Sequence, residues 1–279
     1  NVYEAARLKE AYYEVICSGY LALKATAGLL SESPIVKKDC VIIDCAFGVG
    51  SIAADRLKDI EVSGTRLNLV LDCELRNVAF AGPVNDACGA EHVQKGRQPP
   101  VGVTRQGDQG KLMCSYDGDA DRIVFHAFLD DNWVLYDGDK IAILMAKLLQ
   151  QELEAAGIHD TRAKFGVVQT AYANGASTDC LRSMKVPVAM AKTGVKFLHH
   201  VAEQYDIGLY FEANGHGTVL FSEKFLALVR AGAEEGAPPR KVVAFKRLEA
   251  LTQAINQAVG DAISDMLVVL ACLHILQCD

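Results

Sequence analysis

The sequence lacks two patterns that would each place it in a familiar class of protein. It has no excess of basic residues: the formal net charge is −7 at pH 7, which argues against a nucleic-acid-binding or anionic-membrane surface. Its nine cysteines, an odd number, contain no C-x-x-C pair, so neither a disulfide framework nor a zinc site is indicated. Reduced, buried thiols in a cytoplasmic protein fit this composition better.

The sequence also lacks an apolar run long enough to cross a bilayer. The longest, Met266 to Cys278, falls short of the roughly 20 residues required and contains His274 and Gln277, so we expect a core element there. We expect no membrane partner. No secretory signal is visible, and the first residue is Asn, so we expect a middle fragment of a longer protein.

The pattern of short apolar strands and amphipathic helices predicts an α/β fold. Helical periodicity covers residues 3–30 and 140–156, and apolar strands such as 41–44, 164–168 and 207–211 alternate with helices. A chain of 279 residues with 51% hydrophobic composition can bury two cores. We therefore expect two consecutive α/β/α sandwich domains with mixed sheets, over residues 1–133 and 134–279.

Residues 116–122 read Y-D-G-D-A-D-R and place three carboxylates at alternate positions. In an extended loop such side chains point the same way, so Asp117, Asp119 and Asp121 can converge on one divalent cation. Three carboxylates leave coordination positions open, which suits a Mg²⁺ that also contacts a phosphoryl oxygen. Arg122 can supply a bidentate phosphate contact.

Two alternatives compete with a metal-binding role for residues 117–122, which we call the metal loop. A calcium-binding EF-hand also begins D-x-D-x-D, but it needs Gly and Glu where this chain has Arg122 and Phe128. The other alternative is that Asp-Gly-Asp forms only a turn. The same pattern recurs at 137–139 without a third acid, and we expect a helix N-cap there.

A glycine motif at 48–53 offers a different function. It matches G-x-G-x-x-[GA] after a strand, and Asp72 is expected to end the next strand, 67–72, as in a dinucleotide-binding turn. Strand–Gly–helix turns also form for steric reasons alone, and Phe47 would crowd a pyrophosphate. A dinucleotide-dependent oxidoreductase remains an alternative.

Residues 212–218 read E-A-N-G-H-G-T and combine a carboxylate, an amide and an imidazole. The glycines allow positive φ, so Glu212, Asn214 and His216 can face one cavity and contact sugar hydroxyls. The alternative is a glycine-rich hairpin with polar residues in solvent. Lys196, at an expected helix start, can contact a phosphate, although a solvated lysine fits equally well.

The segments D-G-D-A-D-R and E-A-N-G-H-G-T, in this order, resemble the α-D-phosphohexomutases. Within that superfamily the second segment is similar to the phosphoacetylglucosamine mutase branch, as are residues 169–175, 193–196 and 260–267. The resemblance covers nearly the whole chain. It implies a four-domain enzyme that interconverts N-acetylglucosamine 6-phosphate and 1-phosphate, through a phosphoserine and a bisphosphate intermediate, in UDP-N-acetylglucosamine biosynthesis.

The resemblance also assigns roles to individual residues. It implies that Asp117, Asp119 and Asp121 hold Mg²⁺, and that Arg122 lies beside the phosphoserine and acts in catalysis. Glu212, Asn214 and His216 are then expected to contact the sugar. With Lys196, placed by its position at a helix start, they form the expected binding site for a small-molecule sugar phosphate.

Two motifs of the family are missing: no serine precedes a histidine, as in the nucleophile loop T-A-S-H-N, and no R-x-S-G-T phosphate loop occurs. We therefore expect the N- and C-terminal domains to be missing partners of this chain. The chain alone is expected to bind Mg²⁺ weakly and to lack turnover. A non-catalytic sugar-phosphate-binding paralogue is the alternative from another class.

Overall fold

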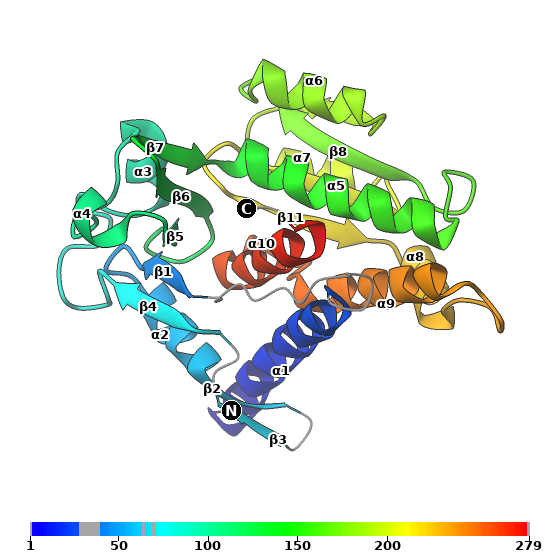
Figure 1. The fold of residues 1–279 in the computed structure, drawn as a ribbon, viewed down its shortest axis with the longest axis horizontal. Coiled ribbons are helices and arrows are strands. Elements are labelled where there is room, and N and C mark those ends of the chain that lie inside the picture. Colours follow the sequence, from blue (N-terminus) through cyan, green and yellow to red (C-terminus); the bar gives the residue numbers. More distant parts are fainter. Residues whose placement is uncertain (1, 28–39, 63–64, 69–70, 278–279) are drawn as a thin grey trace.

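The apolar strands assemble into two separate mixed sheets, in a computed structural model that describes residues 2–27, 40–62, 65–68 and 71–277 (Figure 1). The first sheet has the order β4-β1-β5-β6-β7, with β1 (Val41–Asp44), β4 (Cys73–Arg76), β5 (Leu112–Tyr116), β6 (Ile123–Leu129) and β7 (Asn132–Tyr136). Strands β4, β1 and β5 are parallel, whereas β5, β6 and β7 are antiparallel neighbours. The carboxyl ends of the parallel strands meet at one edge, where the three-aspartate loop leaves β5.

The second sheet has the order β11-β10-β8-β9. Its strands are β8 (Phe165–Thr170), β9 (Val188–Ala191), β10 (Ile207–Phe211) and β11 (Gly217–Phe221). Strands β10, β8 and β9 are parallel, and β10 and β11 form an antiparallel hairpin. The loop of that hairpin is the E-A-N-G-H segment. A separate small hairpin joins β2 (Asp59–Val62) to β3 (Thr65–Asn68).

Helices cover both faces of each sheet, because apolar side chains of alternate residues point to opposite sides. In β1, Val41 and Ile43 belong to the main core, whereas Ile42 packs on the other face with Met113 and Phe128. The helices are α1 (Val2–Ala27), α2 (Gly50–Asp55) with a 3-10 turn (Arg56–Lys58), α3 (Ala90–Gly96), α4 (Arg105–Asp108), α5 (Gly138–Ala156), α6 (Gly175–Ser183), α7 (Val195–Ala202), α8 (Glu223–Ala231), α9 (Pro239–Ala254) and α10 (Ala262–Leu276).

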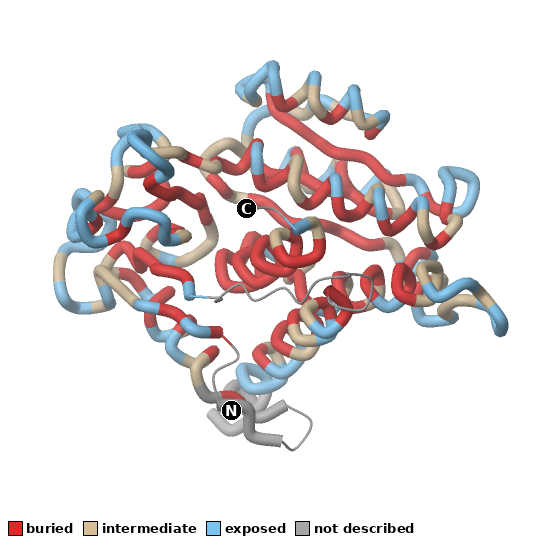
Figure 2. Tube along the Cα trace, in the orientation of Figure 1, coloured by how far each residue is buried: buried red, intermediate tan, exposed pale blue. Residues whose placement is uncertain are grey.

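Helix α10 lies between the two sheets and is buried on all sides over most of its length (Figures 1 and 2). Its sequence is apolar all round, as expected for a helix without a solvent face. One continuous core extends from strands of the first sheet, past α10, to strands of the second. The expectation of a core element at the C-terminal apolar run is confirmed.

The predicted α/β fold with two mixed, helix-covered sheets is confirmed. The strand expected at 67–72 is wrong, because β3 ends at Asn68 in a hairpin and the parallel neighbour of β1 is β4. The expected helix at 3–30 is observed to Ala27, and its last residues lie outside the described part. The division at residue 133 stays a prediction, and β7 runs on to Tyr136 within the first sheet.

Among the residues that the structure describes, none of the helices combines the length and the apolar character that a membrane crossing requires.

His126 on β6 is a buried imidazole in the core of the first sheet. Its Nε2 lies 3.1 Å from the Ser115 hydroxyl, and its ring packs near Trp133 with 5.7 Å between ring centroids. Burial lowers the pKa of His126 to about 4. Because the unfolded chain keeps a histidine pKa near 6.5, protonation favours unfolding below that pH.

We predict that the free energy of unfolding falls by about 3 kcal/mol between pH 6.5 and pH 4 through this one group. The variant His126→Gln should lose most of that pH dependence, as measured by urea unfolding at several pH values. His200→Gln is the control, because that side chain is 82% exposed and should leave the dependence unchanged. Equal slopes for wild type and His126→Gln would contradict the prediction.

Candidate functional site

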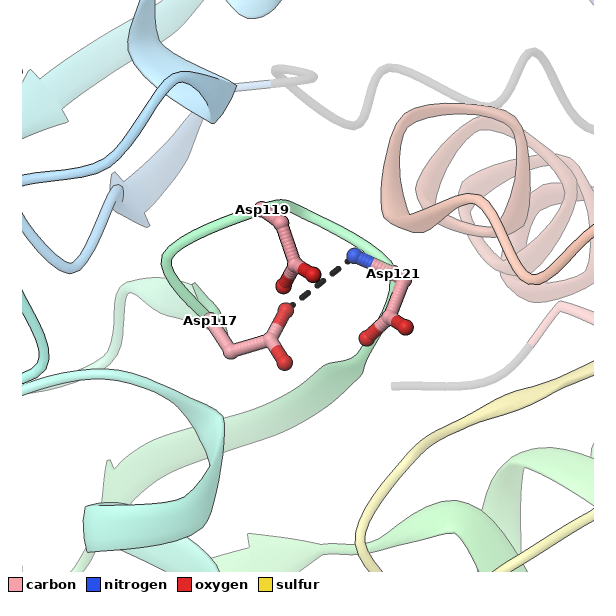
Figure 3. Close-up of side chains that lie close together, drawn as sticks. All are labelled: Asp117, Asp119 and Asp121. Atoms are coloured by element: carbon pink, nitrogen blue, oxygen red, sulfur yellow. Dashed lines mark hydrogen bonds between the residues drawn. The ribbon is translucent and has the colours of Figure 1, made fainter. Parts of the chain in front are cut away.

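The three aspartates of the loop between β5 and β6 converge on one point (Figure 3). One carboxylate oxygen from each of Asp117, Asp119 and Asp121 lies within 4.8 Å of the others. Asp117 is buried at the end of β5, Asp121 is half-buried, and Asp119 is exposed. The sequence spacing therefore produces the convergence expected of it, while their role as metal ligands stays a prediction.

Backbone hydrogen bonds to Asp117 hold the loop closed. Its Oδ1 accepts from the amides of Asp121 and Arg122, both at 3.1 Å, and the first of these bonds is drawn in Figure 3. Ala120 takes a positive φ of 60°, which turns the chain back toward β6. The buried first acid thus serves as the anchor of the turn that presents the other two.

The electrostatics of this loop fit a divalent cation. Burial, together with repulsion from the nearby Asp121 and Asp119, raises the pKa of Asp117 to about 7. The Oδ1 of Asp121 is buried and accepts no hydrogen bond within the described part of the chain. Three crowded carboxylates, with a buried oxygen that accepts no hydrogen bond, are unfavourable as they stand, and a hard cation would relieve that cost.

The glycines of the G-x-G motif support the metal loop. The amide of Val49 donates to the carbonyl of Gly118 at 3.1 Å, and a Cβ on Gly48 would lie 2.1 Å from that same oxygen. Asp72 precedes β4 and is exposed, so it cannot occupy the carboxyl end of a second strand, where a ribose would bind. The dinucleotide alternative is therefore wrong.

Asp44, which sequence reasoning did not single out, organises the loops around the site. Its Oδ1 accepts from the amide of Ala46 and the side chain of Asn77, and its Oδ2 accepts from the amide of Gly89. One buried carboxylate thus joins the loops after β1 and β4 to the start of α3. Its position at the carboxyl end of a buried strand was the available signal.

Arg122 lies across the acidic cluster rather than pointing away from it. Its Nε is 3.4 Å from Asp117 Oδ2 and 3.6 Å from Asp121 Oδ1. Its Nη1 reaches Glu91 on α3 at 3.4 Å, a partner that the sequence did not reveal. About a third of the side chain, 32%, stays exposed, so the guanidinium can also face a ligand at the loop.

The hairpin loop of the second sheet docks directly on the metal loop. Arg122 and His216 form an antiparallel β-bridge, and the amide of Ile123 donates to the carbonyl of Gly215 at 3.1 Å. His216 Nδ1 lies 3.2 Å from Asp121 Oδ2. The alternative of a solvent-facing hairpin is therefore half right: the segment is a hairpin loop, but it is packed against the acids.

The other predicted sugar-binding residues lie on the same hairpin loop or next to it. Glu212 is half-buried, and its Oε1 accepts from the amide of Gly194, which precedes α7. Asn214 Oδ1 accepts from the amide of His216 and fixes the turn. Lys196 is exposed in the first turn of α7, with its Nζ 5.0 Å from the centroid of the Phe197 ring. The loop before α7 therefore joins the hairpin loop through Glu212.

The start of α10 completes the junction. Asp261 caps α10 by accepting from the amides of Ile263 and Ser264, and the amide of Ala262 donates to the carbonyl of Ala120 at 2.9 Å. A cavity of about 280 Å³ opens beside the metal loop, lined by Asp119, Ala120, Asp261 and residues of α1 and α2. Asp119 is therefore accessible from that side.

Residues 137–278 match a family described as "Phosphoacetylglucosamine mutase AMG1, domain III". The chain belongs to the phosphoacetylglucosamine mutase family. It is 42% identical over 266 residues to the phosphoacetylglucosamine mutase of Sus scrofa, covering 95% of this chain and 46% of that protein. The enzyme of Saccharomyces cerevisiae is 41% identical over 273 residues, again 95% of this chain and 47% of the relative.

Solved structures of the same family share the fold. The N-acetylphosphoglucosamine mutase of Aspergillus fumigatus, in complex with GlcNAc-6P and magnesium, has a TM-score of 0.81 at 38% identity, covering 94% of this chain and 50% of that one. The product complex of an N-acetylglucosamine-phosphate mutase of the α-D-phosphohexomutase superfamily gives 0.82 at 37% identity, with 95% and 48% coverage. The chain thus spans about half the length of the relatives it matches.

Because the hairpin loop packs closely against β6, we predict that Gly215 cannot be replaced without loss of stability. Gly215 has φ +89°, and a Cβ there would lie 1.9 Å from the carbonyl oxygen of Ile123. Gly215→Ala should therefore cost about 3 kcal/mol or more, from backbone strain plus separation of the two loops. Urea unfolding monitored by circular dichroism measures this.

Gly157→Ala is the matched control, because Gly157 also has a positive φ, +67°, but nothing lies within 4 Å of its Cβ position. That variant should cost only about 1 kcal/mol, the strain alone. Similar losses for both variants would show that the contact between the loops contributes nothing.

Proposed function

We propose that this chain is the metal- and sugar-binding half of a phosphoacetylglucosamine mutase, which interconverts N-acetylglucosamine 6-phosphate and 1-phosphate through a phosphoserine enzyme and a bisphosphate intermediate. The observation that carries the proposal is the contact between the loop of three aspartates and the E-A-N-G-H loop. A relative with 38% identity is described in complex with GlcNAc-6P and magnesium, which supports the same ligands here.

A cytoplasmic location and a role in UDP-N-acetylglucosamine formation belong to the same proposal, and free cysteines are compatible with it.

The acidic loop is the proposed Mg²⁺ site. Asp117, Asp119 and Asp121 would supply one oxygen ligand each and leave positions for phosphoryl oxygens. A cation bound there would neutralise negative charge on the phosphoryl group during transfer. Arg122, which already lies among these carboxylates, would place a second positive charge next to the same group.

The hairpin loop is the proposed sugar site. Glu212 keeps one carboxylate oxygen beyond the one that accepts from Gly194, and Asn214 has an amide nitrogen that can donate to a hydroxyl. Because the hairpin is bonded to the metal loop, a sugar held there stays at a fixed distance from the acids. Phosphoryl transfer depends mainly on such positioning and on charge neutralisation.

We predict that the 279-residue chain binds Mn²⁺, a paramagnetic substitute for Mg²⁺, and that Asp119→Asn weakens binding at least tenfold. Asp119 is exposed, so its loss should leave the fold intact. Electron paramagnetic resonance titration of free Mn²⁺ measures the affinity. Asp131→Asn, an exposed acid in the turn between β6 and β7, is the control and should bind as wild type does.

For turnover, we predict that the chain alone has no mutase activity and that the polypeptide of full family length has it. Asp119→Asn in that longer protein should reduce kcat at least a hundredfold while circular dichroism stays unchanged, because charge neutralisation is removed. A coupled assay for N-acetylglucosamine 1-phosphate measures the rate. Full activity of the variant would refute the metal assignment, and sugar-phosphate binding without turnover in the longer protein would favour the non-catalytic paralogue.

A further inference from the structure

His216 lies at the point where three segments meet. Its Nδ1 is 3.2 Å from Asp121 Oδ2, and its backbone pairs with Arg122 in the β-bridge between the hairpin loop and β6. Its side chain is 14% exposed, much less than that of Asp121 at 34%. The imidazole thus faces the acid more than it faces solvent.

The opposite edge of the His216 ring is closed by the loop before α10. A Cβ on Gly260 would lie 2.6 Å from Nε2 and 2.8 Å from Cδ2 of His216, and 2.9 Å from the carbonyl oxygen of Asp121. Nothing larger than glycine fits there without moving the ring or the metal loop. The ring is therefore held between Gly260 and Asp121.

Asp121 has two oxygens in different environments. Oδ2 faces His216, whereas Oδ1 is buried, accepts no hydrogen bond among the described residues and lies toward Arg122. A contact to one oxygen fixes the rotation of a carboxylate and so sets the direction of the other. Carboxylates that bind metals are commonly oriented in this way by a neighbouring side chain.

We propose that His216 is a positioning residue for the cation site: its imidazole, backed by Gly260, orients the carboxylate of Asp121 toward Asp117 and Asp119. This role differs from the sugar contact expected from the sequence, and it makes the hairpin loop part of the metal site. The inference rests on the cation site of the proposed function and is independent of its sugar chemistry.

The test compares Mn²⁺ affinity of the 279-residue chain in wild type, His216→Ala and His216→Asn. Removing an orienting partner of a metal ligand typically weakens metal binding 10- to 100-fold, so we expect a loss of about that size for His216→Ala. The side-chain nitrogen of Asn can occupy the place of Nδ1. His216→Asn should therefore stay within about threefold of wild type.

Gly260→Ala provides a second variant that removes no polar group. Its Cβ would displace the His216 ring, so its Mn²⁺ affinity should fall as in His216→Ala. His200→Ala is the control for loss of an exposed imidazole and should bind as wild type does. Near-ultraviolet circular dichroism shows whether each variant keeps its packing.

The outcomes separate this inference from the proposed function. Wild-type affinity in folded His216→Ala would overturn the positioning role and return His216 to the sugar site. Equal losses of Mn²⁺ affinity in His216→Ala and His216→Asn would also overturn it, because the nitrogen retained in Asn would then have no effect on binding. No Mn²⁺ binding by wild type would refute the cation site itself.

Discussion

The site depends on one interaction, the pairing of the β10–β11 hairpin loop with the start of β6. The amide of Ile123 donates to the carbonyl of Gly215, and the backbones of Arg122 and His216 form an antiparallel β-bridge. Both contacts join the hairpin loop of the second sheet to the first sheet, at Ile123 in β6 and at Arg122 just before it, so the acidic loop and the hairpin loop cannot shift independently. The close approach leaves no space for a Cβ at Gly215, and at Gly138 such an atom would lie 1.9 Å from the Glu212 carbonyl. At these two positions the backbones of two segments are in direct contact, so only glycine fits.

Helix α10 gives this junction a rigid base. It is buried between the sheets; its first residue, Ala262, donates to the metal loop, and Gly260 in the loop before it packs against the His216 ring. Packed interiors deform little, so a helix anchored in the core holds its N-terminal loop in place. We therefore expect larger movements of the chain outside this junction. The exposed face of Asp119 and the cavity beside it mark the open side.

Local patterns were enough to predict part of this structure. Alternating acids predicted the convergence of Asp117, Asp119 and Asp121, and the strand and helix periods predicted an α/β fold with two sheets. The strand expected at 67–72 failed because a β-hairpin competes with a parallel strand for the same apolar residues, and spacing alone does not separate them. The contact of His216 with Asp121 could not be predicted, because it joins residues far apart in sequence through a bridge between sheets. Asp44 had a signal, its place at the end of a buried strand, but its partners Asn77 and Gly89 lie 33 and 45 residues away and could not be predicted from local spacing.

The acidic loop also explains why the surrounding contacts are needed. Burial and the two neighbouring carboxylates raise the pKa of Asp117, and the buried Oδ1 of Asp121 accepts no hydrogen bond among the described residues. Without restraint, such a loop would relax by turning its acids outward to water. Here the backbone amides fix Asp117, His216 faces Asp121, and Gly118 is pressed against the turn after β1. The fold therefore holds the carboxylates in an arrangement that is unfavourable alone and would become favourable if a cation bound there, which is the physical requirement for a preorganised metal site.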